Sequence, residues 1–221
     1  MVKYFEPDSQ WVDPEIKFIV ISNNKTSLWY YEHVRSSWDK YAPKFKKSRF
    51  EATVPNTIKE HSRIVDLNFF NKAPMQEMTV WRSFSETEKA VWYSHARLWK
   101  RCVETNKSLI IVEHDCLLEY TLSKNLLCVH DMVCLSRWTN GNNKPRWVPA
   151  AAAAYYITPP IAKILLERVP TPIVYNVDGW IHTVCAQRGD FKLNVARQCD
   201  LNPKIGNTIK HPPNDIDTKF L

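Results

Sequence analysis

The sequence predicts a single α/β domain with a mostly parallel central sheet flanked by helices. Short β-rich runs alternate along the chain with segments that have helical spacing, which is typical of this fold class. The 221 residues are 44% hydrophobic and 24% charged, as in a globular domain with a buried core, and the chain is short for two domains. We expect the domain at residues 16–200, between an irregular lead-in (1–15) and a polar C-terminal tail (201–221).

The N-terminal part of the chain begins with a β-rich run at residues 16–22, which ends in the turn-forming Asn23-Asn24-Lys25. Aromatic and charged residues then recur at helical spacing over residues 26–41, and Pro43 ends that helix. A weaker strand is predicted at residues 50–54. Residues 55–80 show no clear period, so we expect mostly loop there, with one possible short helix.

The clearest helix begins at Ser85 and ends at Asn106. Ser85 and Glu88 have the spacing of a capping box, in which each side chain bonds the other residue's backbone amide. One stripe of the helix carries Val91, His95, Leu98 and Cys102. The opposite side, expected in solvent, carries Arg97, Lys100 and Arg101. An apolar strand follows at residues 109–112.

The C-terminal part contains a strand at residues 132–135, an exposed polar loop at 139–145 and a run at 150–157 that fits either a strand or a helix. Thr158-Pro159-Pro160 favours a strand that leads into a helix at 161–168, because proline is accepted in the first helical turn. In such sheets, ligands bind beyond the carboxyl ends of the strands.

Composition narrows the function classes. No apolar run reaches the ~18–20 residues that cross a bilayer, and residues 1–7 lack signal-peptide features. We therefore expect a cytoplasmic protein, in the host cytoplasm for a viral one. The six cysteines include no Cys-x-x-Cys pair, which favours reduced buried thiols over zinc or disulfides. A net charge of +7 fits phosphate-bearing ligands, nucleic acid, anionic membrane surfaces or an ordinary solvated surface.

An acidic pair, Glu113 and Asp115, follows the strand at 109–112. Two carboxylates at a strand end can share one hard cation such as Mg²⁺ or Mn²⁺, with phosphates and water completing the coordination. The motif by itself also fits a solvated acidic turn.

The run at residues 85–115 resembles the central block of the family-25 glycosyltransferases, the lipopolysaccharide and collagen galactosyltransferase group. The residues that carry the resemblance are Ser94-His95, Leu98-Trp99 and Glu113-His114-Asp115. Residues 18–23, 49–52, 155–166 and 176–178 look like further segments of that family in the same order. The resemblance spans about residues 16–185 and implies a GT-A-like fold, a UDP-type sugar donor, Mn²⁺ or Mg²⁺, and inversion at the anomeric carbon.

The resemblance implies a donor site built from two segments. Asp115 would bind the metal, and Glu113 the metal or the ribose. His114 stands where the family has a middle Asp, so it would alter the metal preference or leave the site independent of metal. Asn23 and Lys25 would touch the uracil or ribose.

The remaining candidate site residues come from other parts of the chain. Asp178, beside Gly179, is either the base that deprotonates the acceptor hydroxyl or a cap of the following segment. Trp180 is the candidate acceptor-binding ring, and Trp138 and Trp147 are further candidates for stacking on a sugar or a base. His95 is either a buried core residue or, by the family pairing, a donor-site residue beneath the nucleotide sugar.

Three functions remain open. The acceptor is most simply a surface glycan such as lipopolysaccharide. The alternative is duplex DNA with hydroxymethylated bases, as modified by viral enzymes; the basic residues at 44–49 and in the C-terminal tail, Lys204 and Lys210, favour it. The third is a non-catalytic nucleic-acid-binding protein, which the histidine within the acidic motif would suit.

Overall fold

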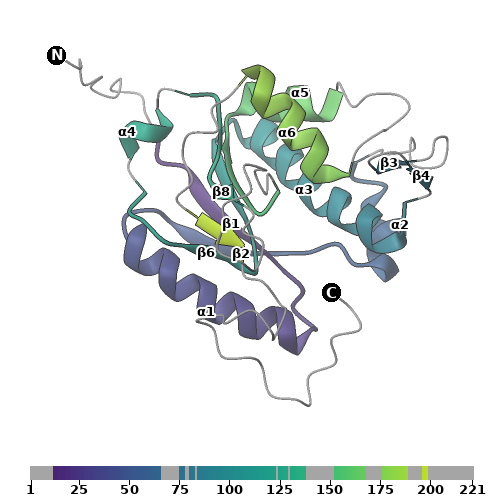
Figure 1. Cartoon of the computed structure of the whole chain (residues 1–221), viewed down its shortest axis with the longest axis horizontal. Coiled ribbons are helices and arrows are strands. Elements are labelled where there is room, and N and C mark those ends of the chain that lie inside the picture. The colour runs from purple at the N-terminus through teal and green to yellow at the C-terminus, as the bar shows by residue number, and fades with distance from the viewer. Residues whose placement is uncertain are drawn as a thin grey trace.

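The chain forms a five-stranded sheet between helices (Figure 1). The computed structural model describes residues 12–65, 75–77, 80–82, 84–122, 124–128, 130–137, 152–167, 176–188 and 196–198. The sheet has the order β2-β1-β5-β9-β7. Its strands are β2 (Lys47–Glu51), β1 (Glu15–Val20), β5 (Leu109–Glu113), β9 (Ala154–Ile157) and β7 (Met132–Cys134).

Four of the five strands run in one direction. Strand β1 is parallel to β2 and β5, whereas β9 is antiparallel to both β5 and β7. The predicted α/β class with a mostly parallel sheet is confirmed, and β9 is the reversed strand. Because β9 is reversed, its first residues lie at the same edge as the carboxyl ends of the other strands. Residues 21–25, 51–53, 113–115, 135–137 and 152–153 therefore meet at one edge.

Helices cover both faces of the sheet (Figure 1). Helix α1 (Lys25–Tyr41) packs on one face, and α3 (Glu86–Thr105), α5 (Pro159–Glu167) and α6 (Val177–Arg188) pack on the other. Strand β1 shows the alternation that makes this possible, since Ile16 and Phe18 join the core under α1 and Ile19 joins the core under α3. Both faces of the sheet are thus buried.

Helix α3 has the ends that its sequence predicts. The Ser85 hydroxyl accepts from the Glu88 amide at 3.2 Å, and the Glu88 carboxylate accepts from the Ser85 amide at 2.9 Å. Asn106 ends the helix in the left-handed conformation, with φ 49°. Arg97 differs from expectation, because its guanidinium is partly buried over the Phe50 ring, 4.7 Å from the ring centroid.

Two sequence-based assignments needed adjustment. Strand β2 begins three residues earlier than expected and ends at Glu51. The whole of α6 was missed, although those of its apolar side chains that the structure describes as buried have clear helical spacing; these are Val177, Trp180, Ile181 and Val184. The residues 154–157, assigned to strand or helix, form a strand.

The smaller elements lie around this sheet. A three-stranded sheet has the order β6-β10-β8, and β3 pairs with β4 in a separate hairpin. These elements are η1 (Pro55–Thr57), α2 (Ile58–His61), β3 (Met75–Glu77), β4 (Val80–Arg82), β6 (Cys116–Leu118), α4 (Lys124–Leu127), β8 (Ser136–Arg137) and β10 (Ala196–Gln198). No helix within the described ranges combines the length and the apolar character that a membrane span requires.

Candidate active site

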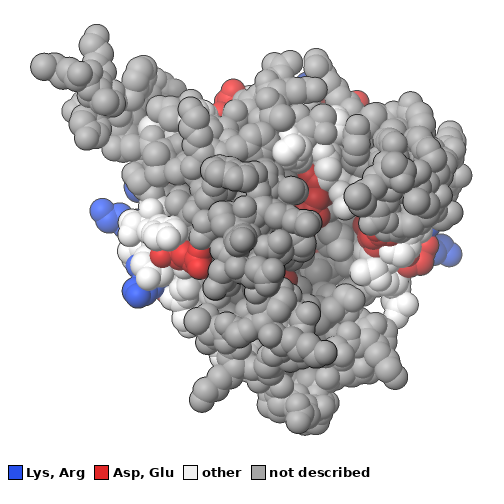
Figure 2. Space-filling view, in the orientation of Figure 1, with Lys and Arg blue, Asp and Glu red and all other residues white. Residues whose placement is uncertain are grey.

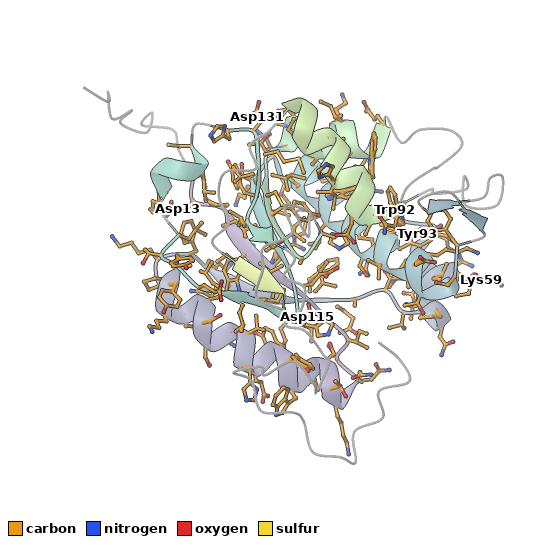
Figure 3. The ribbon with its side chains drawn as sticks, in the orientation of Figure 1. Asp13, Lys59, Trp92, Tyr93, Asp115 and Asp131 are labelled. Carbon is orange, nitrogen blue, oxygen red and sulfur yellow. The ribbon has the colours of Figure 1, made fainter. Side chains whose placement is uncertain are left out.

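The acidic motif lies where β5 leaves the sheet. Residues 109–112 are buried, and Glu113 is the last residue of the strand, level with Ile19 of β1. A turn at residues 114–115 leads into β6. The Glu113 side chain keeps 22% of its surface exposed, whereas Asp115 is 8% exposed. Figure 3 shows Asp115 near the middle of the molecule, between α1 and α3. The acidic motif therefore lies at the edge where the parallel strands end.

Asp178 reaches the same edge from a distant part of the chain. The cap of α6 is Asn176, whose side-chain oxygen accepts from the Gly179 amide at 2.8 Å. Asp178 instead accepts from the Ala152 amide at 2.9 Å, through Oδ1. The next residue, Ala153, accepts from the Glu113 amide at 2.8 Å. The side chain of Asp178 and the backbone of Glu113 are thus hydrogen-bonded to two consecutive residues, Ala152 and Ala153.

The charges of three carboxylates act on one another at this edge. The pKa of Glu113 is raised to about 8, first by burial, then by the negative charges of Asp115 and Asp178, with His114 acting in the opposite direction. Crowded carboxylates disfavour the ionised state unless a positive charge is added. A cation or the hydroxyl groups of a sugar would relieve this repulsion.

The donor set fits a cation that takes few ligands from the protein. Within the described part of the chain, no group of three or more His, Cys, Asp or Glu side chains is arranged to hold a metal. Mg²⁺ in nucleotide-dependent enzymes is commonly bound by one or two carboxylates plus phosphates. Glu113 and Asp115 match that smaller set.

His95 lies beneath Glu113 and is fully buried. Its Nε2 lies 3.4 Å from Oε1 of Glu113, and its Nδ1 lies 2.8 Å from the Tyr155 hydroxyl. Burial lowers the pKa of His95 to about 4, against the raising effect of Asp178, so the ring is neutral at pH 7. The imidazole therefore contacts Glu113 and does not face open space.

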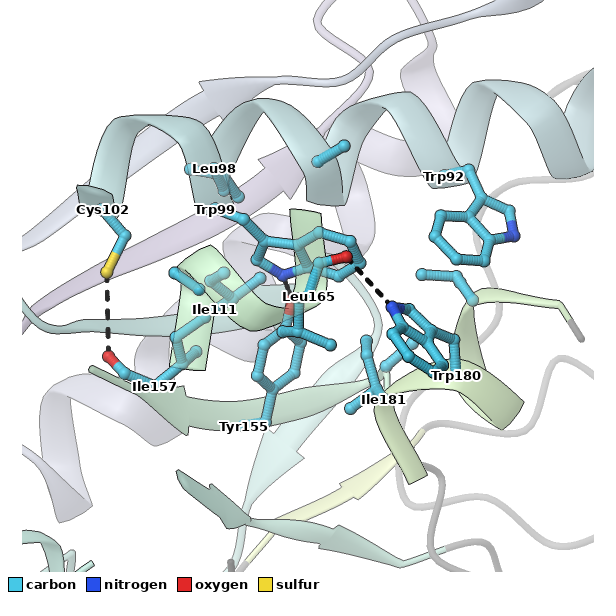
Figure 4. Packing of buried hydrophobic residues seen from close by; sticks show 14 of the residues in the cluster. Trp92, Leu98, Trp99, Cys102, Ile111, Tyr155, Ile157, Leu165, Trp180 and Ile181 are labelled. Atoms are coloured by element: carbon cyan, nitrogen blue, oxygen red, sulfur yellow. Dashed lines mark hydrogen bonds between the residues drawn. The ribbon is translucent and has the colours of Figure 1, made fainter. Parts of the chain in front are cut away.

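Tyr155 connects this histidine to the hydrophobic core. Its hydroxyl accepts from the Trp99 indole N–H at 2.8 Å (Figure 4). Burial raises the pKa of Tyr155 well above its usual value, so the hydroxyl keeps its proton and can donate it to an acceptor. Sequence patterns indicated no role for Tyr155 at the site, because its partners are 60 and 56 positions away.

Ser94, the other half of the Ser-His pair, holds a second segment at the same edge. Its hydroxyl accepts from the Thr53 amide at 2.8 Å and donates to the Ala90 carbonyl at 3.0 Å. Thr53 lies two residues after β2. The consecutive residues Ser94 and His95 thus connect α3 to the ends of both β2 and β5.

The turn between β1 and α1 supplies the remaining polar groups of this edge. Asn24 caps α1 by accepting from the Ser27 amide at 2.9 Å. The neighbouring Asn23 and Lys25 are exposed. His114 lies on the α1 side, with its ring centroid 6.3 Å from that of Tyr30. The structure thus brings both β1-turn residues to the same edge as the carboxylates.

Trp180 is in the core rather than on a face that could bind an acceptor. It is 7% exposed, and its indole N–H donates to the Leu165 carbonyl at 3.1 Å (Figure 4). Trp138 and Trp147 lie outside the described residues. Packing between α5 and α6, rather than ligand binding, accounts for Trp180.

Among the basic residues at 44–49, Lys47 is engaged within the fold, whereas Lys44, Lys46 and Arg49 are exposed. The Lys47 ammonium donates to the Ala42 carbonyl at 2.7 Å, and Arg49 lies over the Tyr31 ring at 5.7 Å. Lys46 is 3.7 Å from Glu15. In Figure 2, the visible acidic side chains include some near the middle of the face, and the visible basic ones lie toward its two sides. Lys204 and Lys210 lie outside the described residues.

A family model matches the central part of the chain. Residues 32–137, just under half of the chain, match the model of glycosyltransferase family 25, described as LPS biosynthesis protein. No curated protein matches the chain. The matched segment contains the Ser94-His95 pair and the motif from Glu113 to Asp115. This match over residues 32–137 and the mixed α/β fold with helices on both faces of the sheet make the chain similar to the family-25 glycosyltransferases.

Proposed function

We propose that the protein transfers a sugar from a UDP-type donor to a hydroxyl of a glycan acceptor, with inversion at the anomeric carbon. The observation that carries this proposal is the convergence of Glu113, Asp115 and Asp178 at the carboxyl edge of the sheet. The family match favours a glycan of the lipopolysaccharide type as the acceptor.

Asp178 is the proposed general base. The Ala152 amide holds its Oδ1, which leaves Oδ2 to take the proton from the acceptor hydroxyl as that oxygen attacks the anomeric carbon. The base must act on the face of the sugar opposite the leaving diphosphate. Because Asp178 comes from α6 and not from the β5 turn proposed to hold the diphosphate, it can approach the sugar from another side.

The donor site consists of the β5 turn and the β1 turn. Asp115 and Glu113 would hold Mn²⁺ or Mg²⁺ together with the donor phosphates, and the cation would neutralise charge on the departing diphosphate. Asn23 and Lys25, exposed beside this edge, would contact the uracil or the ribose. His114 leaves the protein with two carboxylate ligands in the motif, which favours a cation held jointly by protein and donor.

The decisive experiment combines product analysis with two substitutions at the site. The protein is incubated with Mn²⁺, a panel of UDP-sugars and truncated lipopolysaccharide acceptors, and products are identified by mass spectrometry. Asp178→Asn should lose at least about 100-fold in transfer, the lower end expected for loss of a general base. Asp115→Asn should abolish transfer and weaken binding of UDP in the presence of Mn²⁺.

Asp131→Asn is the matched control, because Asp131 is exposed at the start of β7, at the opposite edge of the sheet (Figure 3). It should keep full transfer. Circular dichroism checks that each variant is folded. Full transfer by a folded Asp115→Asn variant would refute the metal assignment, and full transfer by Asp178→Asn would refute the base assignment. Product NMR tests inversion through the anomeric configuration.

A further inference from the structure

We propose that His95 is a positioning residue, held by Tyr155 with its proton on Nε2 so that it donates to Oε1 of Glu113 and fixes that carboxylate at the donor site. This inference rests on the proposed function for its consequence in catalysis. The hydrogen-bond arrangement itself can be tested without any transfer activity.

The direction of each hydrogen bond follows from the chemistry of Trp99. An indole N–H can only donate, so the Tyr155 oxygen accepts from it at 2.8 Å. The Tyr155 hydroxyl has one proton left to donate, and Nδ1 of His95 lies 2.8 Å away. If Nδ1 accepts, the proton of the neutral imidazole is on Nε2, which faces Glu113 at 3.4 Å. In this assignment, each buried polar atom in the series of contacts from Trp99 through Tyr155 and His95 to Glu113 has a partner.

The opposite tautomer satisfies fewer groups. With the proton on Nδ1, the imidazole would donate to the Tyr155 oxygen, which already accepts from Trp99. The Tyr155 proton would then have no acceptor among these contacts, and Nε2 of His95 would have a partner only where the Glu113 carboxyl donates its own proton. Because an unmade buried hydrogen bond costs more than a made one contributes, the Nε2–H form is favoured.

Because His95 is buried and Glu113 is partly exposed, His95 can affect a ligand only through Glu113. The histidine is fully buried, whereas the Glu113 side chain is 22% exposed, so the carboxylate lies between the ring and the open edge. The 3.4 Å separation is long for a hydrogen bond. Hydrogen bonds of this kind commonly shorten when the substrate complex forms. His95 therefore orients the carboxylate that binds the ligand.

Two substitutions at His95 separate positioning from core packing. His95→Gln keeps an N–H near the place of Nε2 and can still donate to Glu113. His95→Asn keeps a polar atom near the place of Nδ1 but is too short to reach the carboxylate. If His95 only fills the core, His95→Asn, which keeps the contact with Tyr155, should be the better tolerated variant. If His95 positions Glu113, His95→Gln should be the more active one.

The kinetic result expected is a loss for His95→Asn of about 10- to 100-fold in kcat/KM for the UDP-sugar, the range for residues that orient ligand-binding side chains. His95→Gln should stay within about 5-fold of the unmodified protein, a loss well below that range. Binding of UDP with Mn²⁺, measured by calorimetry, should follow the same order. Equal losses for the two variants, with both folded, would overturn the proposal.

The spectroscopic test uses the metal-free protein and needs no turnover. The ¹⁵N chemical shifts of the His95 ring should show Nε2 protonated and Nδ1 unprotonated, with the same pattern in Tyr156→Phe. Tyr155→Phe should mix the two tautomers, because Nδ1 loses its donor. A proton on Nδ1 in the unmodified protein would overturn the inference even if transfer is observed. Absence of transfer with the Nε2–H form present would count against the proposed function only.

Discussion

The buried hydroxyl of Tyr155 offers a direct test of the contacts beneath the site. Tyr155→Phe keeps the ring in the core but removes the oxygen that Trp99 donates to and the proton that His95 accepts. Tyr155, Trp99 and His95 are all fully buried, so water cannot replace the lost partner. Each unsatisfied buried group costs about 1–3 kcal/mol, so we expect a loss of about 3 kcal/mol in the free energy of unfolding.

Tyr156→Phe is the matched control on the next residue of β9. Tyr156 is equally buried, but its hydroxyl donates to Ser108 at 3.4 Å, and Ser108 is partly exposed. Water can therefore satisfy Ser108 after the substitution. We expect a loss of no more than about 1 kcal/mol, the typical net value of one hydrogen bond.

Urea unfolding followed by circular dichroism measures the difference between these two variants. With a slope of about 2.5 kcal/mol per molar urea, the Tyr155 variant should unfold about 1 M earlier than the unmodified protein. Similar midpoints for Tyr155→Phe and Tyr156→Phe would refute the argument that the Tyr155 hydroxyl bridges two buried groups. A double-mutant cycle with Trp99→Phe should show coupling of about 0.5–3 kcal/mol.

Three further predictions concern acid stability, thiol reactivity and a helix cap. The pKa of His95 is lowered from 6.5 to about 4 in the folded protein, so the unfolded chain gains a proton first as pH falls. Between pH 7 and pH 5, the free energy of unfolding of the unmodified protein should therefore fall by about 2 kcal/mol more than that of His95→Gln, as measured by urea unfolding. Equal losses in the two proteins would contradict the burial of a neutral His95. Burial raises the pKa of Cys102 to about 12, so iodoacetamide at pH 8 should leave this thiol unmodified in the folded protein. The partly exposed Cys128 should react under the same conditions, and peptide mass spectrometry distinguishes the two. Ser85→Ala should lower the free energy of unfolding by about 1 kcal/mol, because it removes the cap of α3. Ser36→Ala at an exposed position of α1 is the control and should cost about a few tenths of a kcal/mol. Equal losses in thermal or urea unfolding would refute the capping role of Ser85.

Local patterns predicted the elements that have strong signals of their own. The capping box at Ser85 and the left-handed Asn106 bound α3 where the sequence placed it. The apolar run at residues 109–112 is the buried part of β5. Weak signals placed elements less well, since β2 was displaced by three residues and α6 was missed. The spacing of Val177, Trp180, Ile181 and Val184 could have revealed α6, but Gly179 in its first turn obscured the pattern.

Long-range contacts explain most of what was missed at the site. Asp178 stood out only as an acidic residue beside a glycine, with base and cap as alternatives. The structure gives the cap to Asn176 and brings Asp178 to the Ala152 amide, 26 positions away. Trp180 looked like a ligand-binding ring close to Asp178 in sequence, but residues two positions apart on a helix point to different sides, and the indole lies in the core.

Local sequence patterns were enough to predict the α/β class, the limits of α3 and the acidic motif at the end of β5, because these depend on residues close along the chain. Three features became visible only in the folded chain: β9 runs antiparallel, Asp178 lies at the same edge as Glu113 and Asp115, and the Trp99–Tyr155–His95 contacts end at Glu113. Each of these depends on the pairing of segments that are distant in sequence. Such pairing is set by burial of both faces of the sheet, and no local propensity encodes it.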